Sequence, residues 1–201
     1  MNFLAHLVLA GDDEDLRLGA MLGDFIRGRQ VLADFSQGVG LGIMLHRHID
    51  GFTDSLPDIA RLRSWFSPPF RRYGGIVIDL AFDHQLAMRW ESYSEITLEQ
   101  FDLDVRELLA RNDTLVPSGL RQFMQYADRR GLFATYRDET EILHSLRGIG
   151  HRLSRPNPLH RVQEVWGEFE PLISAAFEQA FGQVQSDVAD WVKSKSTMTG
   201  S

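Results

Sequence analysis

Helical periodicity is the feature that most constrains this chain, because apolar residues recur three and four positions apart along nearly its whole length. Segments 3–8, 16–26, 41–50 and 76–91 each read as a helix. The alternating apolar and polar pattern that would indicate strands is nearly absent. We therefore predict an all-α fold. No break in the pattern is strong enough to mark a domain boundary, so we expect a single helical domain over residues 1–193.

Residues with known preferences for helix starts mark two boundaries. Asp54 stands shortly before Pro57, a combination typical of an N-cap followed by proline in the first turn. Thr97 and Gln100 form a capping box for a helix over 98–111. Both signals favour several separate helices over one continuous rod.

The C-terminal part of the chain predicts one long helix and a tail. Asn157 and Pro158 open the helix, and Pro171 is expected to kink or break it, because proline lacks the N–H that a helix interior needs. Residues 194–201 are polar, and we expect them to form a disordered tail.

The composition excludes several kinds of chemistry. The 201 residues include no cysteine, which excludes disulfides, thiolate zinc sites, iron–sulfur clusters and a cysteine nucleophile. A formal net charge of −7 disfavours generic binding to nucleic acid. No apolar run approaches the roughly 20 residues of a membrane span, and the N-terminus lacks the positive flank of a signal peptide. We therefore expect a cytoplasmic protein that binds neither nucleic acid nor a membrane.

Histidine and aspartate recur in the first half of the chain at spacings that suit a metal site. His46 and Asp50 are four residues apart, and Asp79 and Asp83 repeat that spacing with His84 adjacent. Residues four apart share one face of a helix, with about 5–6 Å between their Cβ atoms. Neutral imidazoles and carboxylates together suit a divalent metal such as manganese, iron or zinc. A metal between two such helices would also balance carboxylates that are costly to bury alone.

Two further residues strengthen the metal hypothesis, although simpler roles stay open. His6 and Asp24 occur in the same half of the chain, and so many acids within helices need a reason. Against this, Asp50 could simply pair with Arg47 or Arg27. Other catalytic motifs are absent, since no glycine-rich loop is followed by lysine and no HExxH segment exists.

Five short motifs and one arginine-rich segment resemble a known family. The motifs are Asn2-Phe3-Leu4-Ala5-His6-Leu7, Asp24-Phe25-x-Arg27-Gly28, His46-Arg47-x-Ile49-Asp50, Thr53-Asp54-x-Leu56-Pro57 and Asp79-x-x-x-Asp83-His84. They resemble those of the bacterial acyl carrier protein phosphodiesterases, also called acyl carrier protein hydrolases. Tyr136-Arg137-Asp138 and residues 152–155 extend the match, which covers most of the chain up to about Leu159.

The resemblance implies an activity, a fold type and a cofactor. Members of that family are regarded as helical HD-like phosphohydrolases that depend on a metal, usually manganese as Mn²⁺. They cleave the phosphodiester that joins 4′-phosphopantetheine to a serine of holo-acyl carrier protein, which gives the apo-protein. The resemblance therefore implies an acidic protein substrate and a link to fatty acid biosynthesis within lipid metabolism.

The resemblance also implies roles for individual residues. The metal candidates are His6, Asp24, His46, Asp50, Asp83 and His84, and we expect His46, Asp83 and His84 to bind the ion directly. The catalytic candidates are Asp24, Arg47 and Asp79, with Arg47 placed to clamp phosphate oxygens. The substrate candidates are Asn2, Arg27, Arg152 and Arg155. The sequence departs from the usual HD order, because Asp83 precedes His84.

Two alternative functions remain at this point. The same metal chemistry would serve an HD-type hydrolase of a nucleotide or cyclic nucleotide, which only a comparison of substrates would distinguish. A helical binding protein without enzymatic activity would carry its histidines as structural residues. Such a protein would contain no stoichiometric metal after purification without chelator.

Overall fold

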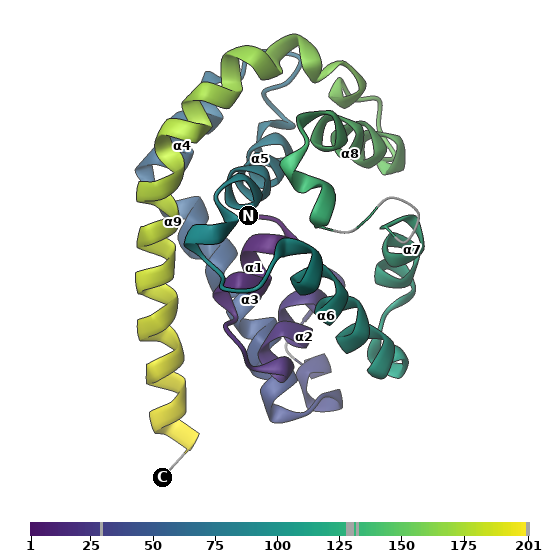
Figure 1. Cartoon of the computed structure of the whole chain (residues 1–201), viewed down its shortest axis with the longest axis vertical. Helices are drawn as coiled ribbons and strands as arrows, with labels where there is room; N and C mark the ends of the chain where they lie inside the picture. Colours follow the sequence, from purple (N-terminus) through teal and green to yellow (C-terminus); the bar gives the residue numbers. More distant parts are fainter. Residues whose placement is uncertain (29, 128–130, 132, 200–201) are drawn as a thin grey trace.

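The computed structural model describes every residue of the chain except 29, 128–130, 132 and 200–201 (Figure 1). All regular structure in this described part is helical and forms one all-α domain, which confirms the predicted fold class. The α-helices are α1 (Phe3–Leu9), α2 (Glu14–Leu22), α3 (Gln37–Ser55), α4 (Pro57–Trp65), α5 (Gly74–Met88), α6 (Leu98–Arg111), α7 (Ser118–Ala127), α8 (Glu139–Arg152) and α9 (Gln163–Thr199). The HD-like character of the bundle stays a prediction.

Helix α5 lies at the centre of the packing because it is apolar on every side. Val77, Leu80, Phe82 and Leu86 are all buried, although they point in different directions around the helix. Helices α1, α4, α8 and α9 pack around it, as expected for a helix without a polar face. Asp83 lies in the same core, so its carboxyl group needs polar partners.

Glycines allow α2 and α3 to pack closely side by side. A Cβ on Gly19 would lie 2.6 Å from the Cα of Gly42, and a Cβ on Gly42 would lie 2.5 Å from the carbonyl oxygen of Leu16. Either side chain would force the helices apart. The close contact sets the position of the α3 side chains relative to α2.

Helix α9 is longer and more continuous than the sequence predicts. It begins at Gln163 and runs through Pro171 without a break, in an arc over α5 and α8 that becomes straight toward the C-terminus (Figure 1). The sequence predicted a kink or a break at Pro171, and of these two outcomes the break is wrong. The predicted start at Asn157 and Pro158 is also wrong, because α9 begins at Gln163, after a short 3-10 turn over Leu159–Arg161. The straight part of α9 is tied to α3, since His48 Nε2 lies 2.5 Å from Asp187 Oδ2 and the His48 ring stacks on Trp191.

Other helix boundaries differ from the sequence prediction by a few residues. Helix α2 ends at Leu22, whose carbonyl accepts hydrogen bonds from the N–H groups of Phe25 and Ile26 in a turn. Asp54 is not an N-cap, because it lies within α3 and pairs with Arg63.

The predicted cap at Thr97 and the predicted tail over residues 194–201 have different outcomes. The Thr97 cap is confirmed, with its side chain accepting a hydrogen bond from the N–H of Gln100. Helix α9 extends to Thr199, into the segment expected to be a tail, while residues 200–201 lie outside the described part. Every helix in the described part is too short or too polar to span a bilayer.

Candidate metal centre

Two histidines and an aspartate from two helices meet at one point in the structure. His6 comes from α1, while His46 and Asp50 lie four residues apart on α3. One potential ligand atom from each residue lies within 4.8 Å of the other two, a separation that one divalent ion can span. The structure thus brings together three of the six residues that were predicted as metal ligands.

The His46 ring has the orientation of a metal ligand. Its Nδ1 donates a hydrogen bond to the carbonyl oxygen of Ala20 at 2.8 Å, because a carbonyl can only accept. Its Nε2 lies 3.3 Å from Asp24 Oδ1 and 3.2 Å from Asp50 Oδ2, where it can hold a proton or a metal ion. Gly23 makes this position possible, since a Cβ there would collide with the ring. A backbone carbonyl commonly orients histidines that bind metals in this way.

His6 supplies a buried imidazole whose polar atoms have no hydrogen-bond partner. The residue is 1% exposed, and neither ring nitrogen makes a hydrogen bond within the described part of the chain. Its Nε2 lies 3.1 Å from Asp50 Oδ1, and its ring stacks on that of His46 with centroids 3.9 Å apart. A buried polar atom without a partner costs about 1–3 kcal/mol. A metal ion bound to Nε2 would remove that cost.

The charges around the two imidazoles favour a cation between them. Burial alone would lower the pKa of His46, but hydrogen bonds and charges from Asp24 and Asp50 outweigh it and raise this pKa to about 9. Burial also opposes ionisation of Asp50, yet the two histidines hold its pKa well below the usual range. Burial and the charge of His46 lower the pKa of His6 to about 4, so its imidazole is neutral at pH 7. A divalent ion could therefore take the place of the proton that His46 Nε2 holds, between Asp24 and Asp50, in the metal-free chain.

The acids of this cluster face solvent, whereas the imidazoles are buried. The side chains of Asp24 and Asp50 are 52% and 45% exposed, compared with 4% for His46. A metal held here would keep coordination positions open on the carboxylate side, as catalytic sites require. Asp24 lies at the exposed edge of the cluster, and its role as a metal ligand stays a prediction.

The α-ammonium group of Met1 lies beside the same acids. It donates a hydrogen bond to Asp79 Oδ1 at 3.1 Å and lies 3.9 Å from Asp50 Oδ1. Burial would lower the pKa of this ammonium group, but the charges of Asp79 and Asp50 raise it. Asp79, predicted as catalytic, is therefore joined to the cluster through the chain terminus and not through a histidine.

Asp83, a predicted metal ligand, has a different set of partners. Its two carboxylate oxygens accept hydrogen bonds from the N–H groups of Leu4 at 2.9 Å and Ala5 at 3.1 Å. Asn2 occupies the N-cap position of α1 but makes no side-chain cap bond, so Asp83 caps this helix from α5. Burial raises the pKa of Asp83 to about 7, against the opposing effect of these two bonds. Both oxygens of Asp83 accept hydrogen bonds from backbone N–H groups, and Asp83 is not part of the histidine cluster.

His84 likewise has its contacts outside the histidine cluster. Its Nδ1 donates a hydrogen bond to the carbonyl oxygen of Tyr136 at 2.7 Å, and its ring lies 6.0 Å from that of Trp166. The residue is 5% exposed. The spacing of Asp83 and His84 suggested ligands, but the structure does not group either residue with His6, His46 and Asp50.

The predicted arginines take different positions. Arg47 donates hydrogen bonds to the carbonyl oxygens of Ile26 at 2.7 Å and Gly28 at 3.1 Å, so it fixes the loop that follows Asp24. That contact gives Arg47 a positioning role, and its predicted role as a clamp on phosphate stays a prediction. Arg27 and Arg155 are exposed on the surface.

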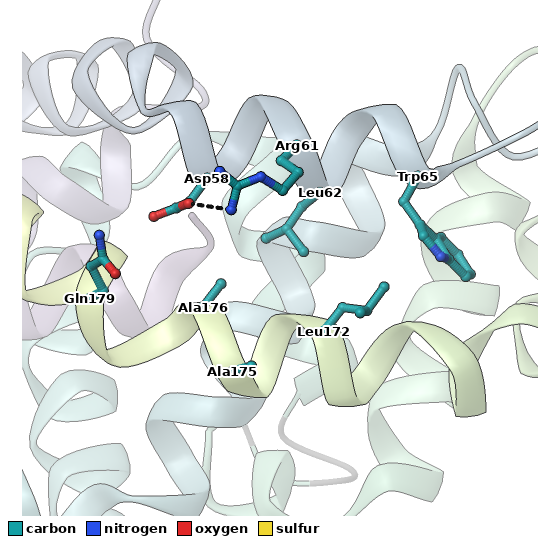
Figure 2. A pocket seen from close by; sticks show the side chains of 8 residues that line it. All are labelled: Asp58, Arg61, Leu62, Trp65, Leu172, Ala175, Ala176 and Gln179. Atoms are coloured by element: carbon teal, nitrogen blue, oxygen red, sulfur yellow. Dashed lines mark hydrogen bonds and ion pairs between the residues drawn. The ribbon is translucent and has the colours of Figure 1, made fainter.

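Two hollows of similar volume occur in different parts of the molecule. One, of about 400 Å³, is lined by Asn2, Phe25, Leu80 and Arg152 among others and borders the cluster through neighbouring residues of the chain. The second, of about 380 Å³, lies between α4 and α9, where Leu62 and Trp65 face Leu172 and two alanines (Figure 2). None of the predicted site residues lines this second hollow.

The comparisons with known proteins agree with one another. The family model described as acyl carrier protein phosphodiesterase matches residues 1–184. A protein of that name from Escherichia coli O157:H7 (strain EC4115 / EHEC) is 34% identical over 187 residues, covering 91% of this chain and 93% of the relative. One from Escherichia coli O6:H1 is 33% identical over 174 residues, covering 85% and 86%. No solved structure matches the chain.

Proposed function

Because the chain belongs to the acyl carrier protein phosphodiesterase family, we propose that it hydrolyses the phosphodiester between 4′-phosphopantetheine and a serine of holo-acyl carrier protein. The products are the apo-protein and free 4′-phosphopantetheine. Family membership makes the chain a hydrolase of a phosphodiester bond, and the proposal adds the reaction, the metal and the residues. We place this activity in the cytoplasm.

The observation that carries the metal part of the proposal is the group formed by His6, His46 and Asp50. Their ligand atoms lie within 4.8 Å of one another, and neither buried His6 nitrogen makes a hydrogen bond to any residue that the structure describes. Asp24 adds a carboxylate 3.3 Å from His46 Nε2. Two imidazoles and two carboxylates suit Mn²⁺, which accepts both nitrogen and oxygen ligands. Bound there, Mn²⁺ would supply an acidified water and draw charge from the phosphoryl oxygens.

The chain's own residues prepare this site in three ways. Ala20 accepts the Nδ1 proton of His46 and so leaves Nε2 directed at the carboxylates. Arg47 fixes the loop that carries Asp24 through two carbonyl oxygens of that loop. Asp83 anchors the start of α1, and thereby His6, to the central helix. Each contact limits the movement of one prospective ligand, as precise metal binding needs.

Recognition of the acidic carrier protein requires a local positive surface, because the chain itself has a formal charge of −7. We propose that Arg27, Arg152 and Arg155 provide it. Arg152 borders the hollow next to the cluster, and Arg27 follows Asp24 by three residues. Exposed charges are screened over about 8 Å at physiological ionic strength, so added salt should raise the KM for the carrier protein.

A pair of matched variants tests the proposal. His46→Gln and His48→Gln each remove one imidazole from the same helix, but His48 contacts Asp187 on α9 and not the cluster. The intact mass of holo-acyl carrier protein is measured after incubation with each variant and Mn²⁺. We expect the wild type and His48→Gln to remove phosphopantetheine and His46→Gln to leave the substrate intact. Full activity of His46→Gln would contradict the proposed site.

A further inference from the structure

The hollow beside the cluster is built mainly from four helices. Its apolar wall consists of Phe3 on α1, Leu80 on α5, Phe123 on α7 and Ile149 on α8, with Phe25 from the loop after α2. Phe3 lies between two other rings, with centroids 6.3 Å from Phe25 and 5.0 Å from Phe123. The volume of about 400 Å³ falls in the range of small-molecule sites.

This hollow borders the candidate metal centre through three direct chain neighbours. Phe25 follows Asp24, which contacts His46, and Leu80 follows Asp79. Asn2 follows Met1, whose ammonium group donates to Asp79. Consecutive Cα atoms lie about 3.8 Å apart, so the backbone that carries three residues of the wall continues directly into the backbone of Met1, Asp24 and Asp79. A phosphodiester at the centre could therefore extend one substituent into the hollow.

Polar side chains stand among these aromatic rings. Asn2, Gln122, Ser145 and Arg152 also line the hollow. The Asn2 amide makes no cap bond to α1, because Asp83 from α5 accepts the helix N–H groups in its place. Asn2 therefore lines the hollow with an amide group that does not cap the helix. Apolar walls with a few placed polar groups are typical of a site for an extended, amide-containing ligand.

Glycine at position 119 leaves space in the hollow that a larger side chain would fill. Gly119 on α7 lines it, and a Cβ at that position would lie 3.1 Å from the ring of Phe25. A larger residue there would press this ring toward the loop that carries Asp24. The small residue keeps both the space and the aromatic wall.

We propose that this hollow binds the pantetheine arm of the substrate, with its amides at the polar side chains and its apolar parts against the phenylalanine rings. This inference rests on the proposed function, since that function supplies a phosphodiester with such an arm. It separates recognition into two surfaces, because the hollow holds the pantetheine side of the diester, which keeps the phosphate, whereas exposed arginines contact the carrier protein, whose serine oxygen is the leaving group. Ser145 and Gln122 then determine the affinity for the arm without taking part in bond cleavage.

Filling either hollow gives a matched test. Ser145→Leu places a larger apolar side chain in the proposed arm site, and Ala175→Leu does the same in the hollow between α4 and α9. Hydrolysis of holo-acyl carrier protein is compared with that of bis(p-nitrophenyl) phosphate, a small diester without the arm. We expect Ser145→Leu to lower kcat/KM for the carrier protein at least roughly tenfold, mainly through KM, and to leave the small diester unchanged. Ala175→Leu should match the wild type on both.

Gln122→Leu is a second variant, which keeps a similar side-chain volume but removes the amide group. Circular dichroism checks that each variant is folded. Equal losses on both diesters would mean that the hollow supports the centre or the fold, which overturns the inference. Wild-type KM for the carrier protein in both Ser145→Leu and Gln122→Leu would overturn it as well.

Direct binding separates this inference from the proposed function. Free 4′-phosphopantetheine is titrated calorimetrically into the wild type, Ser145→Leu and Ala175→Leu. We expect binding that Ser145→Leu weakens roughly tenfold and Ala175→Leu leaves unchanged. If the wild type cleaves holo-acyl carrier protein but Ser145→Leu binds the free arm as tightly as the wild type, the arm site is wrong and the function stands. If no carrier protein is cleaved but the selective binding is seen, the function is wrong and the arm site stands.

Discussion

Adding one methyl group at Gly23 should damage the metal centre without replacing any of its proposed ligands. The residue has ordinary helical angles of φ −53° and ψ −41°, so alanine is allowed by its backbone. On that ground alone, Gly23→Ala should stabilise the chain by about 0.5–1 kcal/mol. The new Cβ would, however, lie 2.6 Å from the Cβ of His46 and nearer still to its ring. The effect of the collision therefore has the opposite sign to the backbone effect.

The size of the loss follows from the movement that the collision forces. Ordinary contact needs at least 3.4 Å, so the His46 side chain must shift by roughly 1 Å. Overpacking of this kind costs about 1–3 kcal/mol of unfolding free energy. A misplacement of about 1 Å in a catalytic centre can lower turnover roughly 100-fold. We expect both losses in Gly23→Ala, together with weaker Mn²⁺ binding.

Gly51→Ala is the control for this prediction. It lies on α3, one residue beyond Asp50, and a Cβ there meets nothing within 4 Å. Urea unfolding and calorimetric Mn²⁺ titration are measured for both variants, and Gly51→Ala should be as stable as the wild type or more so. If Gly23→Ala were more stable than the wild type and bound Mn²⁺ equally well, the reasoning about the His46 position would be refuted.

Four further predictions concern the surrounding residues. Asp83→Ala leaves two buried N–H groups of α1 without an acceptor and should lower the unfolding free energy in urea by about 1–3 kcal/mol. A weaker Mn²⁺ affinity at unchanged stability would show Asp83 to be a ligand after all. Arg47→Ala should release the loop after Asp24, and steady-state kinetics should show a lower kcat for both the carrier protein and the small diester. A change in KM for the carrier protein alone would mean instead that Arg47 contacts the substrate. In metal-free protein, the folded-state pKa of His46 is raised to about 9 from 6.5, so its stabilisation is complete below pH 6.5 and is lost as the pH rises through 9. Urea unfolding at several pH values should reveal this loss, and its presence in His46→Gln would contradict the assignment to His46. Raising salt should increase KM for the carrier protein but not for bis(p-nitrophenyl) phosphate, and salt-independent kinetics would move the alternative function of a nucleotide hydrolase to first place.

Local sequence patterns predicted the helices well because periodicity and capping are local properties. The cap at Thr97 was predicted correctly from its neighbouring residues. The helix does not break at Pro171, because a proline can stay within a helix when the rest of that helix packs along its length, as α9 does on α4 and α5. The family resemblance was also confirmed, since the motifs that suggested it belong to a family model that covers residues 1–184.

The site was only partly predictable because its contacts join distant segments. The spacing of His46 and Asp50 correctly placed both on one face of a helix, and His6 joined them as expected. The same spacing argument gave Asp83 a similar role, but its partners are the N–H groups of α1, nearly 80 residues away in the chain. A sequence signal existed in hindsight, because Asn2 and its neighbours start a helix that needs an acceptor and Asp83 lies in an otherwise apolar segment.

The most direct test of the account is the turnover of holo-acyl carrier protein as Mn²⁺ is returned to the metal-free chain. Protein is stripped with chelator, Mn²⁺ is added stepwise, and the apo-protein formed is measured by intact mass. We predict no turnover without metal and a rise that saturates when the site formed by His6, His46 and Asp50 is filled, with no rise in His46→Gln. Turnover by metal-free chain at the rate of the loaded one would contradict the account.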